Sequence, residues 1–467
     1  MKRPSWMAAV GLTIVVAAGA AGQTAGGSQE KKIGDVANVP QPAARTVIRC
    51  GALIDGETEK VSRNVTIMLA GDRIERVLET REGALSRVVA PTGALDIDLS
   101  SETCLPGLID THTHVLLQGD ITAEDYDRQL LKWSPEYRTI LGTQSARKAL
   151  EYGFTTIRDL ETEGAGYADV DIKKAIQNGV VPGPRMQVAT RALDVTGAYP
   201  LLGYAPNVPA PHGVQVCDGP EKCRLAVREQ IMHGADWIKV YSDRSYYVDA
   251  NPPPGVGPAP VVNDVPTFTM EELRAIVDEA HRERHRVSSH ASALNGVHNS
   301  VETGVDSIEH GQYIADADLK TMAARGIYYV PTLYVAEYVA PGRGGVWLDM
   351  VKIHADTFRR AQAAGVKIAF GTDAGGFDWN INPAVEFGLM VKYGMTPAQA
   401  LKSATVTASE LLGMQKDIGS IEPGKFADIV AVKGDPLQDI RVLEKVDFVM
   451  KGGAVVKKQP GAASSRE

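Results

Sequence analysis

Cysteine is scarce in this chain, with four residues among 467. They are Cys50, Cys104, Cys217 and Cys223, and no two of them have the Cys-x-x-Cys spacing typical of a zinc site. We therefore expect no cysteine-type metal centre. Four cysteines allow three disulfide pairings, among which the sequence does not choose. The short turn between Cys217 and Cys223 favours a local bridge, and Cys50 could pair with Cys104 if their strands are adjacent.

An excess of positive charge is also missing, because the formal net charge is −8 at pH 7. This charge argues against nucleic acid or an anionic membrane surface as the main partner. Beyond residue 25 the chain contains no internal repeat and no apolar run of the length that a membrane span needs. A hydrophobic share of 44% with 23% charged residues is typical of a globular protein.

The start of the chain predicts an export signal. Two basic residues precede an apolar run from Met7 to Ala21, and Ala18-Gly19-Ala20 fits a small-x-small cleavage site. An uncleaved membrane anchor is the alternative, for which the run is short. We expect residues 1–20 to be a cleaved signal peptide and residues 21–44 a poorly ordered leader. The protein is then periplasmic or secreted, with no stable membrane span after cleavage, and disulfides are permitted.

Two β-rich pieces lie far apart in the chain, at residues 45–104 and 417–460. Between them, residues 105–416 alternate short apolar strands with longer helical periods, which is typical of βα units. The length accommodates a barrel of about 250 residues together with an accessory domain. The predicted fold is therefore α/β: a (β/α)8 TIM barrel over 105–416 and a small β-sandwich domain built from both ends of the mature chain.

Eight barrel strands are expected, at residues 107–114, 155–159, 185–190, 236–241, 286–290, 307–310, 327–331 and 367–373. A helix at 270–284 would begin after Thr269, since Glu272 three residues on completes a capping box. Barrel enzymes place their active sites at the carboxyl ends of the strands, so polar residues there are the functional candidates.

Histidines and an aspartate recur at these predicted strand ends. His112 and His114 are two residues apart, so both side chains point to one face of a strand. His290 and His310 end two further strands, and Asp373 ends the eighth. Each residue alone is also compatible with a structural histidine or a turn. Together they favour a site for zinc or a similar divalent ion, because they would converge at one barrel mouth.

Two more candidates lie on the predicted fourth strand. Lys239 is a cation within an apolar stretch, for which snorkelling or an ion pair is the ordinary explanation. Tyr241 follows two residues later and shares its face, where it could also simply pack. The other histidines are interpreted as structural or solvated, and they are His212, His233, His281, His285, His298 and His354.

The candidates His112, His114, Lys239, His310 and Asp373 lie in segments that resemble the amidohydrolase superfamily. The matching segments are 105–114, 153–159, 234–240, 307–311, 371–374 and 419–430. The resemblance extends over about residues 45 to 458 and is greatest to the secreted prolidase and carboxypeptidase-like group, which includes ochratoxin-hydrolysing amidases. Imidazolonepropionases are more distant relatives.

The resemblance implies a site with two divalent metal ions, taken to be zinc, and a lysine carboxylated by CO2. His112, His114 and Asp373 would hold the first ion, His290 and His310 the second, with the Lys239 carbamate bridging both. A hydroxide shared by the two ions would attack the amide carbonyl. Asp373 would move its proton to the leaving amine, and Tyr241 would hydrogen-bond the carbonyl oxygen.

The function that the resemblance implies is hydrolysis of amide or peptide bonds in small substrates. Dipeptides and N-acyl amino acids are expected, with Xaa-Pro and ochratoxin-like amides included, and a homo-oligomer is possible. A mononuclear cyclic amidase or deaminase is the nearest alternative and would leave Lys239 unmodified. A periplasmic metal- or ligand-binding protein without catalysis is a further one, which the presence of Asp373 argues against.

Two loops over the barrel mouth depart from the pattern of the group, at residues 196–199 and 375–380. Both bear on substrate choice. The loop after the eighth strand carries Phe377 and Trp379, with Tyr199 and Tyr334 expected across the mouth. The alternative is that these rings only pack the loops. We predict an aromatic wall that favours large apolar side chains beside the scissile amide.

Overall fold

The computed structural model describes residues 39–458 except for 59, 80–88, 121, 199–204, 206, 209–210, 244–263 and 345. The expected signal peptide at 1–20, most of the expected leader at 21–44, and Tyr199 lie outside the described residues. No helix in the described part of the chain is long and apolar enough to cross a membrane.

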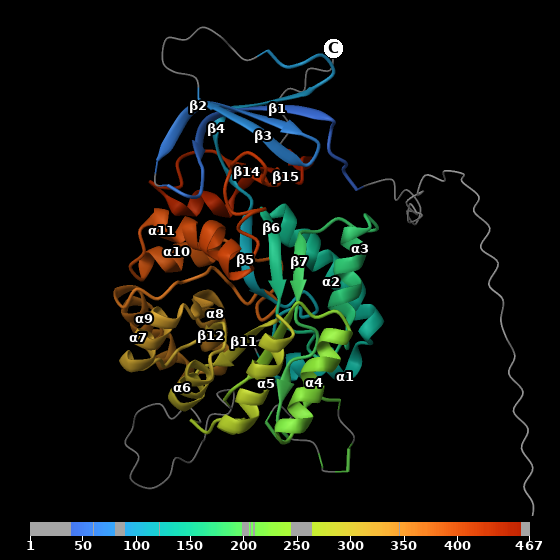
Figure 1. The fold of residues 1–467 in the computed structure, drawn as a ribbon, viewed down its shortest axis with the longest axis vertical. Helices are drawn as coiled ribbons and strands as arrows, with labels where there is room; N and C mark the ends of the chain where they lie inside the picture. Colours follow the sequence, from blue (N-terminus) through green and yellow to red (C-terminus); the bar gives the residue numbers. More distant parts are fainter. Residues whose placement is uncertain are drawn as a thin grey trace, which may run out of the picture. The chain divides into compact units, whose positions relative to one another are not determined.

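Strands from the two β-rich pieces join in one seven-stranded sheet, with the order β16-β15-β14-β4-β1-β2-β3. Figure 1 shows the blue strands of the first piece next to the red strands of the second. The strands are β1 (Arg45–Ile54), β2 (Val61–Ala70), β3 (Arg73–Glu79), β4 (Leu95–Pro106), β14 (Ile429–Val432), β15 (Val446–Lys451) and β16 (Ala454–Lys458).

β4 connects the two pieces, because it pairs with β1 on one side and with β14 on the other. Alternating side chains of the sheet are buried in a common cluster that includes Ile67, Leu99 and Phe448. The Cys50–Cys104 disulfide ties β1 to β4. Hydrogen bonds join all described strands of this part into a single sheet, where the sequence led us to expect the two sheets of a sandwich.

Parallel strands alternate with helices in the middle of the chain, as expected. They pair in the orders β5-β6-β7 and β13-β12-β11-β10-β8-β9. The strands are β5 (Leu108–Thr113), β6 (Phe154–Asp159), β7 (Arg185–Val188), β8 (Leu193–Asp194), β9 (Gln215–Val216), β10 (Trp237–Tyr241), β11 (Arg286–Ala291), β12 (Ser307–His310) and β13 (Tyr328–Val330).

Backbone hydrogen bonds connect these groups of strands to one another. The N–H of Asp236, just before β10, donates to Val188 of β7 at 2.7 Å. At the expected eighth strand, residues 367–373, the chain forms an isolated bridge instead of a regular strand. This segment bonds to β13 through Tyr329 and to β5 through Thr111, at 2.9 Å each. The result is a TIM-barrel-like α/β fold.

Most helices lie between the parallel strands, and the last five follow residue 373. The helices are α1 (Ala123–Lys132), α2 (Pro135–Glu151), α3 (Ala168–Gln177), α4 (Pro220–Met232), α5 (Met270–Arg282), α6 (Leu294–Thr303), α7 (Asp316–Arg325), α8 (Leu333–Arg343), α9 (Val346–Ala363), α10 (Val385–Lys392), α11 (Pro397–Lys402), the π-helix η1 (Ser403–Thr407), α12 (Ala408–Leu411) and the 3-10 helix η2 (Ile440–Glu444). The expected capping box of Thr269 and Glu272 opens α5.

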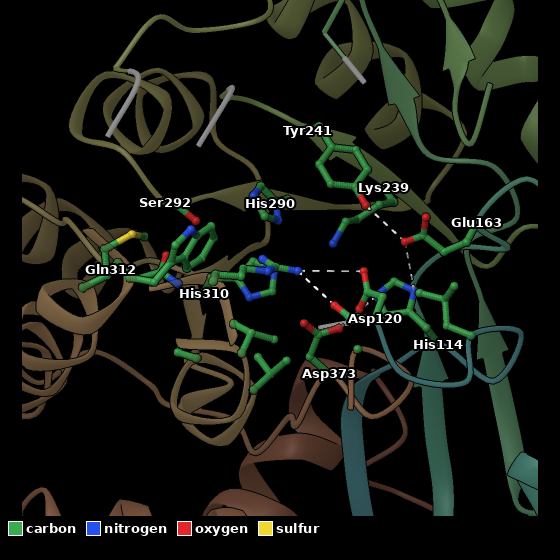
Figure 2. A pocket seen from close by; sticks show the side chains of 18 residues that line it. His114, Asp120, Glu163, Lys239, Tyr241, His290, Ser292, His310, Gln312 and Asp373 are labelled. Carbon is green, nitrogen blue, oxygen red and sulfur yellow. Dashed lines mark hydrogen bonds and ion pairs between the residues drawn. The ribbon is translucent and has the colours of Figure 1, made fainter. Parts of the chain in front are cut away.

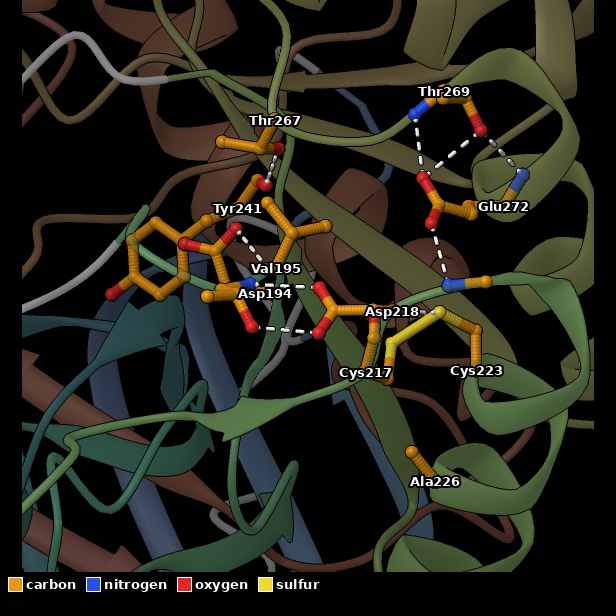
Figure 3. The surroundings of a disulfide bond; sticks show 12 residues. Asp194, Val195, Cys217, Asp218, Cys223, Ala226, Tyr241, Thr267, Thr269 and Glu272 are labelled. Carbon is orange, nitrogen blue, oxygen red and sulfur yellow. Dashed lines mark hydrogen bonds between the residues drawn. A yellow bond between two sulfur atoms is a disulfide. The ribbon is translucent and has the colours of Figure 1, made fainter.

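The second disulfide joins Cys217 to Cys223, so both cysteine pairs considered from the sequence are present. It links the end of β9 to the first turns of α4, and Figure 3 shows its surroundings. Asp218, between the two cysteines, accepts hydrogen bonds from the backbone N–H of Thr196 at 2.9 Å and from its hydroxyl at 2.6 Å. This bridge therefore lies beside the start of the loop that follows β8.

Candidate active site

The residues expected at strand ends meet at one cavity of about 710 Å³, the open solvent at its mouth included. Six of the seven line it, and Figure 2 shows them converging: His114, Lys239, Tyr241, His290, His310 and Asp373. The seventh, His112, is fully buried directly behind them. The parallel strands explain this convergence, since their carboxyl ends meet at one face of the fold.

Short distances connect the candidate metal ligands. The Nε2 atoms of His112 and His114 are 3.3 Å apart, and Oδ1 of Asp373 lies 3.2 Å from Nε2 of His114. The ring centroids of His290 and His310 are 4.4 Å apart. His112, His310 and Asp373 offer ligand atoms that all lie within 4.8 Å of one another, so this cluster could hold a metal ion.

The backbone is strained at two of these residues. His310 and Asp373 have φ values of 67° and 62°, in the left-handed region that side chains other than glycine rarely occupy. Gly375 lets the loop after Asp373 approach β5, because a Cβ atom there would lie 2.2 Å from the carbonyl oxygen of His114. Strain of this kind is concentrated at functional sites, where the surrounding structure holds side chains in a required direction.

Burial determines the protonation of three histidines. Burial lowers the pKa of His112, His290 and His310 well below the usual value, and the nearby charge of Lys239 acts in the same direction. A neutral imidazole is the form that binds a metal ion. Burial also acts to lower the pKa of His114, but the hydrogen bond and charge of Asp373 outweigh it and raise this pKa to about 9.

Outer partners orient two of the imidazoles. Nδ1 of His112 lies 2.8 Å from Glu309, and Nδ1 of His310 lies 2.8 Å from the hydroxyl of Thr332. Both bonds leave Nε2 directed at the cluster. Glu309 in turn accepts a hydrogen bond from Arg158 at 2.9 Å. This is the arrangement in which a carboxylate fixes the tautomer and direction of a metal-binding histidine.

Lys239 is 1% exposed, and its ammonium group has no hydrogen-bond or ion-pair partner among the described residues. The ordinary explanations, snorkelling or an ion pair, therefore do not apply within this part of the chain. Burial lowers its pKa. Four imidazoles, one carboxylate and a buried amine without a direct ion pair among the described residues form a donor set that fits divalent metal ions.

The hydroxyl of Tyr241 faces the cavity from β10 and donates to Glu161 at 2.6 Å. Burial, followed by the charge of Glu163, raises the pKa of Glu161 well above its usual value. Glu163 itself lines the cavity and accepts from the hydroxyl of Tyr126 at 2.7 Å. The Glu161–Glu163 pair was not singled out from the sequence, although both residues follow the end of β6 and could have been found by position.

Other cavity residues were missed because no motif contains them. They include Asp120, Ser292, Gln312 and Arg343. Arg343 donates to the carbonyl oxygen of Asp120 at 3.1 Å, and its guanidinium lies 4.7 Å from the ring centroid of Trp347. Burial raises the pKa of Asp120 to about 8, against the opposing charge of Arg343.

The prediction of an aromatic wall from Phe377 and Trp379 is wrong. Both side chains are buried, at 0% and 1% exposure, and neither lines the cavity. The loop turns inward, and the indole N–H of Trp379 donates to the carbonyl oxygen of Leu117 at 3.1 Å. Tyr334 packs edge-on against Phe377 and does not line the cavity either.

The apolar side of the cavity comes from α8 and α9 instead. Its residues are Val335, Ala336, Val339, Trp347 and Met350. The remaining histidines lie outside the cavity lining, as expected. His281 pairs with Asp306 and His298 with Asp318, at 2.9 and 3.0 Å.

The site gathers imidazoles and a carboxylate at the carboxyl ends of parallel strands. This arrangement is typical of barrel-like hydrolases with a metal site. The sequence profile of the amidohydrolase family matches residues 103–456, so the chain belongs to this family. It is a hydrolase that acts on amide or peptide carbon–nitrogen bonds. Enzymes of this family are generally metal-dependent.

Known proteins resemble the chain over most of its length. Ochratoxinase of Aspergillus niger is 30% identical over 88% of this chain and 86% of its own sequence. The crystal structure of a Xaa-Pro dipeptidase with bound methionine is 33% identical, covering 88% of this chain and all of that one, with a TM-score of 0.75. A prolidase in complex with N-methylphosphonate-L-proline is 30% identical, covers 89% and 100%, and has a TM-score of 0.76.

Proposed function

We propose that the protein is a binuclear metal-dependent amidohydrolase that cleaves amide or peptide bonds of small substrates. The observation that carries the proposal is the convergence of three histidines, Asp373 and the buried Lys239 on one cavity, with the fourth histidine, His112, buried behind them. A single ion would use only part of this donor set. Lys239 is buried and makes no ion pair among the described residues, which supports its conversion by CO2 into a carbamate, an anion that can bridge two ions.

In this proposal His112, His114 and Asp373 hold one ion, and His290 and His310 hold the other. When bound, the ions, most simply zinc, would supply an activated water and polarise the scissile carbonyl group. His112 and His310 would contribute neutral imidazoles, oriented from behind by Glu309 and Thr332.

Proton movement and charge stabilisation are assigned to two side chains at the cavity wall. Asp373 would accept a proton from the attacking water and deliver it to the leaving amine. Its hydrogen bond to His114, at 3.2 Å, holds the carboxylate in place for this transfer. Tyr241 would exchange its bond to Glu161 for one to the carbonyl oxygen as negative charge develops there.

The proposed substrates are dipeptides and N-acyl amino acids, with Xaa-Pro peptides and ochratoxin-like amides included. The similarity of the chain to a Xaa-Pro dipeptidase, a prolidase and ochratoxinase supports this range. The apolar residues of α8 and α9 at the cavity support a preference for an apolar group on one side of the amide.

A substrate screen on metal-replete protein, combined with elemental analysis, tests the proposal. We expect two ions per chain and release of amine from members of the dipeptide, N-acyl and ochratoxin-like panel. One ion with turnover of cyclic amides only would favour the mononuclear cyclic amidase or deaminase. Asp373→Asn separates an enzyme from a binding protein, since an enzyme loses turnover while its substrate affinity is retained in part.

We also propose that the chain is exported and that residues 45–104 and 417–460 form an accessory β domain, a strongly coiled sheet or sandwich, on a (β/α)8 barrel of residues 105–416. The two disulfides support export, because they persist in oxidising compartments. N-terminal sequencing of the exported protein should find a start after about residue 20. An intact Met1 in a membrane fraction would contradict export with cleavage.

A further inference from the structure

Ser292 and Gln312 occupy matching positions beside the candidate metal ligands. Ser292 follows His290 by two residues, and Gln312 follows His310 by two residues. The two histidines lie on strands β11 and β12, which pair in parallel. Hydrogen bonding between the two segments continues past the strand ends, where the backbone N–H of Tyr313 donates to the carbonyl oxygen of Ser292 at 3.0 Å. Both side chains therefore line the same side of the cavity, as Figure 2 shows.

Neither side chain uses its hydrogen-bonding groups within the described part of the protein. Gln312 is 6% exposed, and its buried Oε1 atom has no hydrogen-bond partner among the described residues. Ser292 is 3% exposed, and the same residues offer its hydroxyl no hydrogen bond. Buried polar groups nearly always have a partner. The Oε1 atom of Gln312 is such a buried group without a partner, and its place at the wall of an active-site cavity indicates that a ligand completes it. The hydroxyl of Ser292 lines the same cavity and is available to the same ligand.

The charged side chains of the cavity gather elsewhere. Glu163 and Asp120 lie toward His114, on the side of the cavity away from Ser292 and Gln312 in Figure 2. They are engaged with their own neighbours, Glu163 with the hydroxyl of Tyr126 and Asp120 with Arg343. Asp243 accepts the backbone N–H of Ser292 at 2.5 Å but does not line the cavity. The lining residues on this side, Ser292 and Gln312, are therefore polar and uncharged.

The chemistry of these two groups narrows the ligand. The buried Oε1 atom of Gln312 needs an N–H or O–H donor, which a carboxylate does not provide. The Nε2 group of Gln312 and the hydroxyl of Ser292 also offer donors, which an ammonium ion cannot accept. An uncharged amide supplies a donor and an acceptor together, so it can satisfy both residues.

We propose that Ser292 and Gln312 form a subsite for an uncharged amide beside the amide that is cleaved. This inference rests on the proposed amide hydrolysis and names its substrate class: capped peptides, in which a second neutral amide neighbours the scissile one. Free dipeptides carry an ammonium group at that position and are poorer substrates. Both residues determine specificity and take no part in the chemical step.

Substrate pairs that differ by one atom test the subsite. In N-acetyl-alanyl-phenylalanine the second amide has an N–H, which an ester oxygen replaces in O-acetyl-lactoyl-phenylalanine, and release of phenylalanine is measured for both. The same exchange on the leaving side compares N-acetyl-alanyl-phenylalanine N-methylamide with the corresponding methyl ester. We expect kcat/KM to favour the amide by about tenfold or more at one of the two positions, because a site built for an N–H discriminates against its absence.

Gln312→Met should reduce this preference to near unity, and Ser292→Ala should reduce it in part. Gln230→Met is the matched control, because Gln230 is fully buried outside the cavity lining and bonds the hydroxyl of Thr190 at 3.0 Å. The control should lose thermal stability and keep the preference. Gln312→Met should keep its thermal stability, since Gln312 makes no side-chain hydrogen bond to lose among the described residues.

An unchanged preference in Gln312→Met, or no preference in the wild type at either position, would overturn the subsite. Failure of the proposed function gives a different result, in which the metal-replete wild type releases product from no amide at all. Thermal stabilisation by N-acetyl-phenylalaninamide then tests the subsite without turnover. A larger shift of Tm in the wild type than in Gln312→Met supports it, and equal shifts refute it.

Discussion

Oε2 of Glu309 lies 2.8 Å from Nδ1 of His112, and neither side chain is exposed to solvent. The other carboxylate oxygen accepts from Arg158 at 2.9 Å and from the hydroxyl of Ser288 at 2.8 Å. Glu309 is therefore held by several partners from other strands and in turn fixes the direction of His112. A carboxylate in this position behind a histidine would contribute to metal binding without touching the ion.

Glu309→Gln should weaken metal binding by about 10–100-fold, as expected for the loss of a carboxylate behind a metal-binding histidine. Chelator competition measures the metal Kd. Glu302→Gln is the control, since this glutamate is exposed and forms only a long ion pair with Arg325, at 4.0 Å. An unchanged Kd in Glu309→Gln would show that His112 keeps its orientation without the carboxylate.

Lys239→Ala should lose bound metal and lower kcat/KM by at least about 100-fold, because several kcal/mol of transition-state stabilisation depend on the metal site. Small carboxylic acids such as propionate should restore part of the activity by replacing the carbamate. Lys367→Ala, at a half-exposed lysine paired with Glu410, is the control. Two ions per chain and a full rate in Lys239→Ala would refute the bridging role.

Trp379→Ala should destabilise the protein by about 3–5 kcal/mol, since the indole is fully buried and leaves a cavity. Because Trp379 does not line the active-site cavity, kcat/KM should change by the same factor for large and small substrates. Denaturant unfolding and a two-substrate assay measure both effects, with the exposed Leu348→Ala as control. A loss of kcat/KM confined to bulky substrates would show that Trp379 does contact the substrate.

Glu279 should stabilise the protein in a pH-dependent way. Hydrogen bonds from Arg228 and Arg282 lower the pKa of this 2% exposed carboxyl to about 2, from 4.5. A pKa lowered by folding gives a stability contribution that is complete above pH 4.5 and is lost as the pH falls toward 2. Glu279→Gln should therefore lower Tm at pH 7, with the difference from wild type shrinking below pH 4.5.

Calorimetry across pH 2–7 measures this difference, and Glu271→Gln, at an exposed position of the same helix, is the control. A constant difference between wild type and Glu279→Gln over the whole range would mean that the carboxylate charge is not the source of the stabilisation.

The two disulfides should contribute unequally. Cys50 and Cys104 are 54 residues apart, whereas Cys217 and Cys223 are 6 apart. In the chain-entropy treatment, the longer loop is worth about 4 kcal/mol and the shorter about 2 kcal/mol. Replacing Cys50 and Cys104 by alanine should therefore lower the free energy of unfolding more than replacing Cys217 and Cys223. The reverse order would indicate that local strain, or residual structure in the unfolded state, determines how much each disulfide stabilises the protein.

The strand pattern was sufficient to predict the histidines of the site. A strand end is a local feature of the sequence, and the parallel arrangement brings each end to the same face without further information. His112, His290 and His310 were found in this way. The eighth strand was predicted at 367–373, yet its backbone forms only the isolated bridge of Ile368 to Tyr329 there, and the chain then enters the left-handed conformation of Asp373.

Residues beyond the strand ends were harder to predict. Phe377 and Trp379 were interpreted as a substrate wall. The sequence of a loop rich in aromatic residues is the same whether the loop faces a cavity or the core, so it does not indicate the direction. The direction of the loop depends on the close approach of Gly375 to β5, which no local pattern encodes. Ser292 and Gln312 were missed because neither is a motif residue, although each lies two positions after a candidate ligand.

The position of β4 between β1 and β14 has a consequence for folding. Leu105 in β4 pairs with Val430 in β14, so the sheet joins segments separated by the whole barrel. During synthesis, β4 would present an unpaired edge until the last tenth of the chain follows, and open edges recruit other strands. Pairing across such a distance raises the contact order and slows folding. Completion of this sheet should therefore be a late step, and chains shortened before β14 should aggregate through the exposed edge of β4.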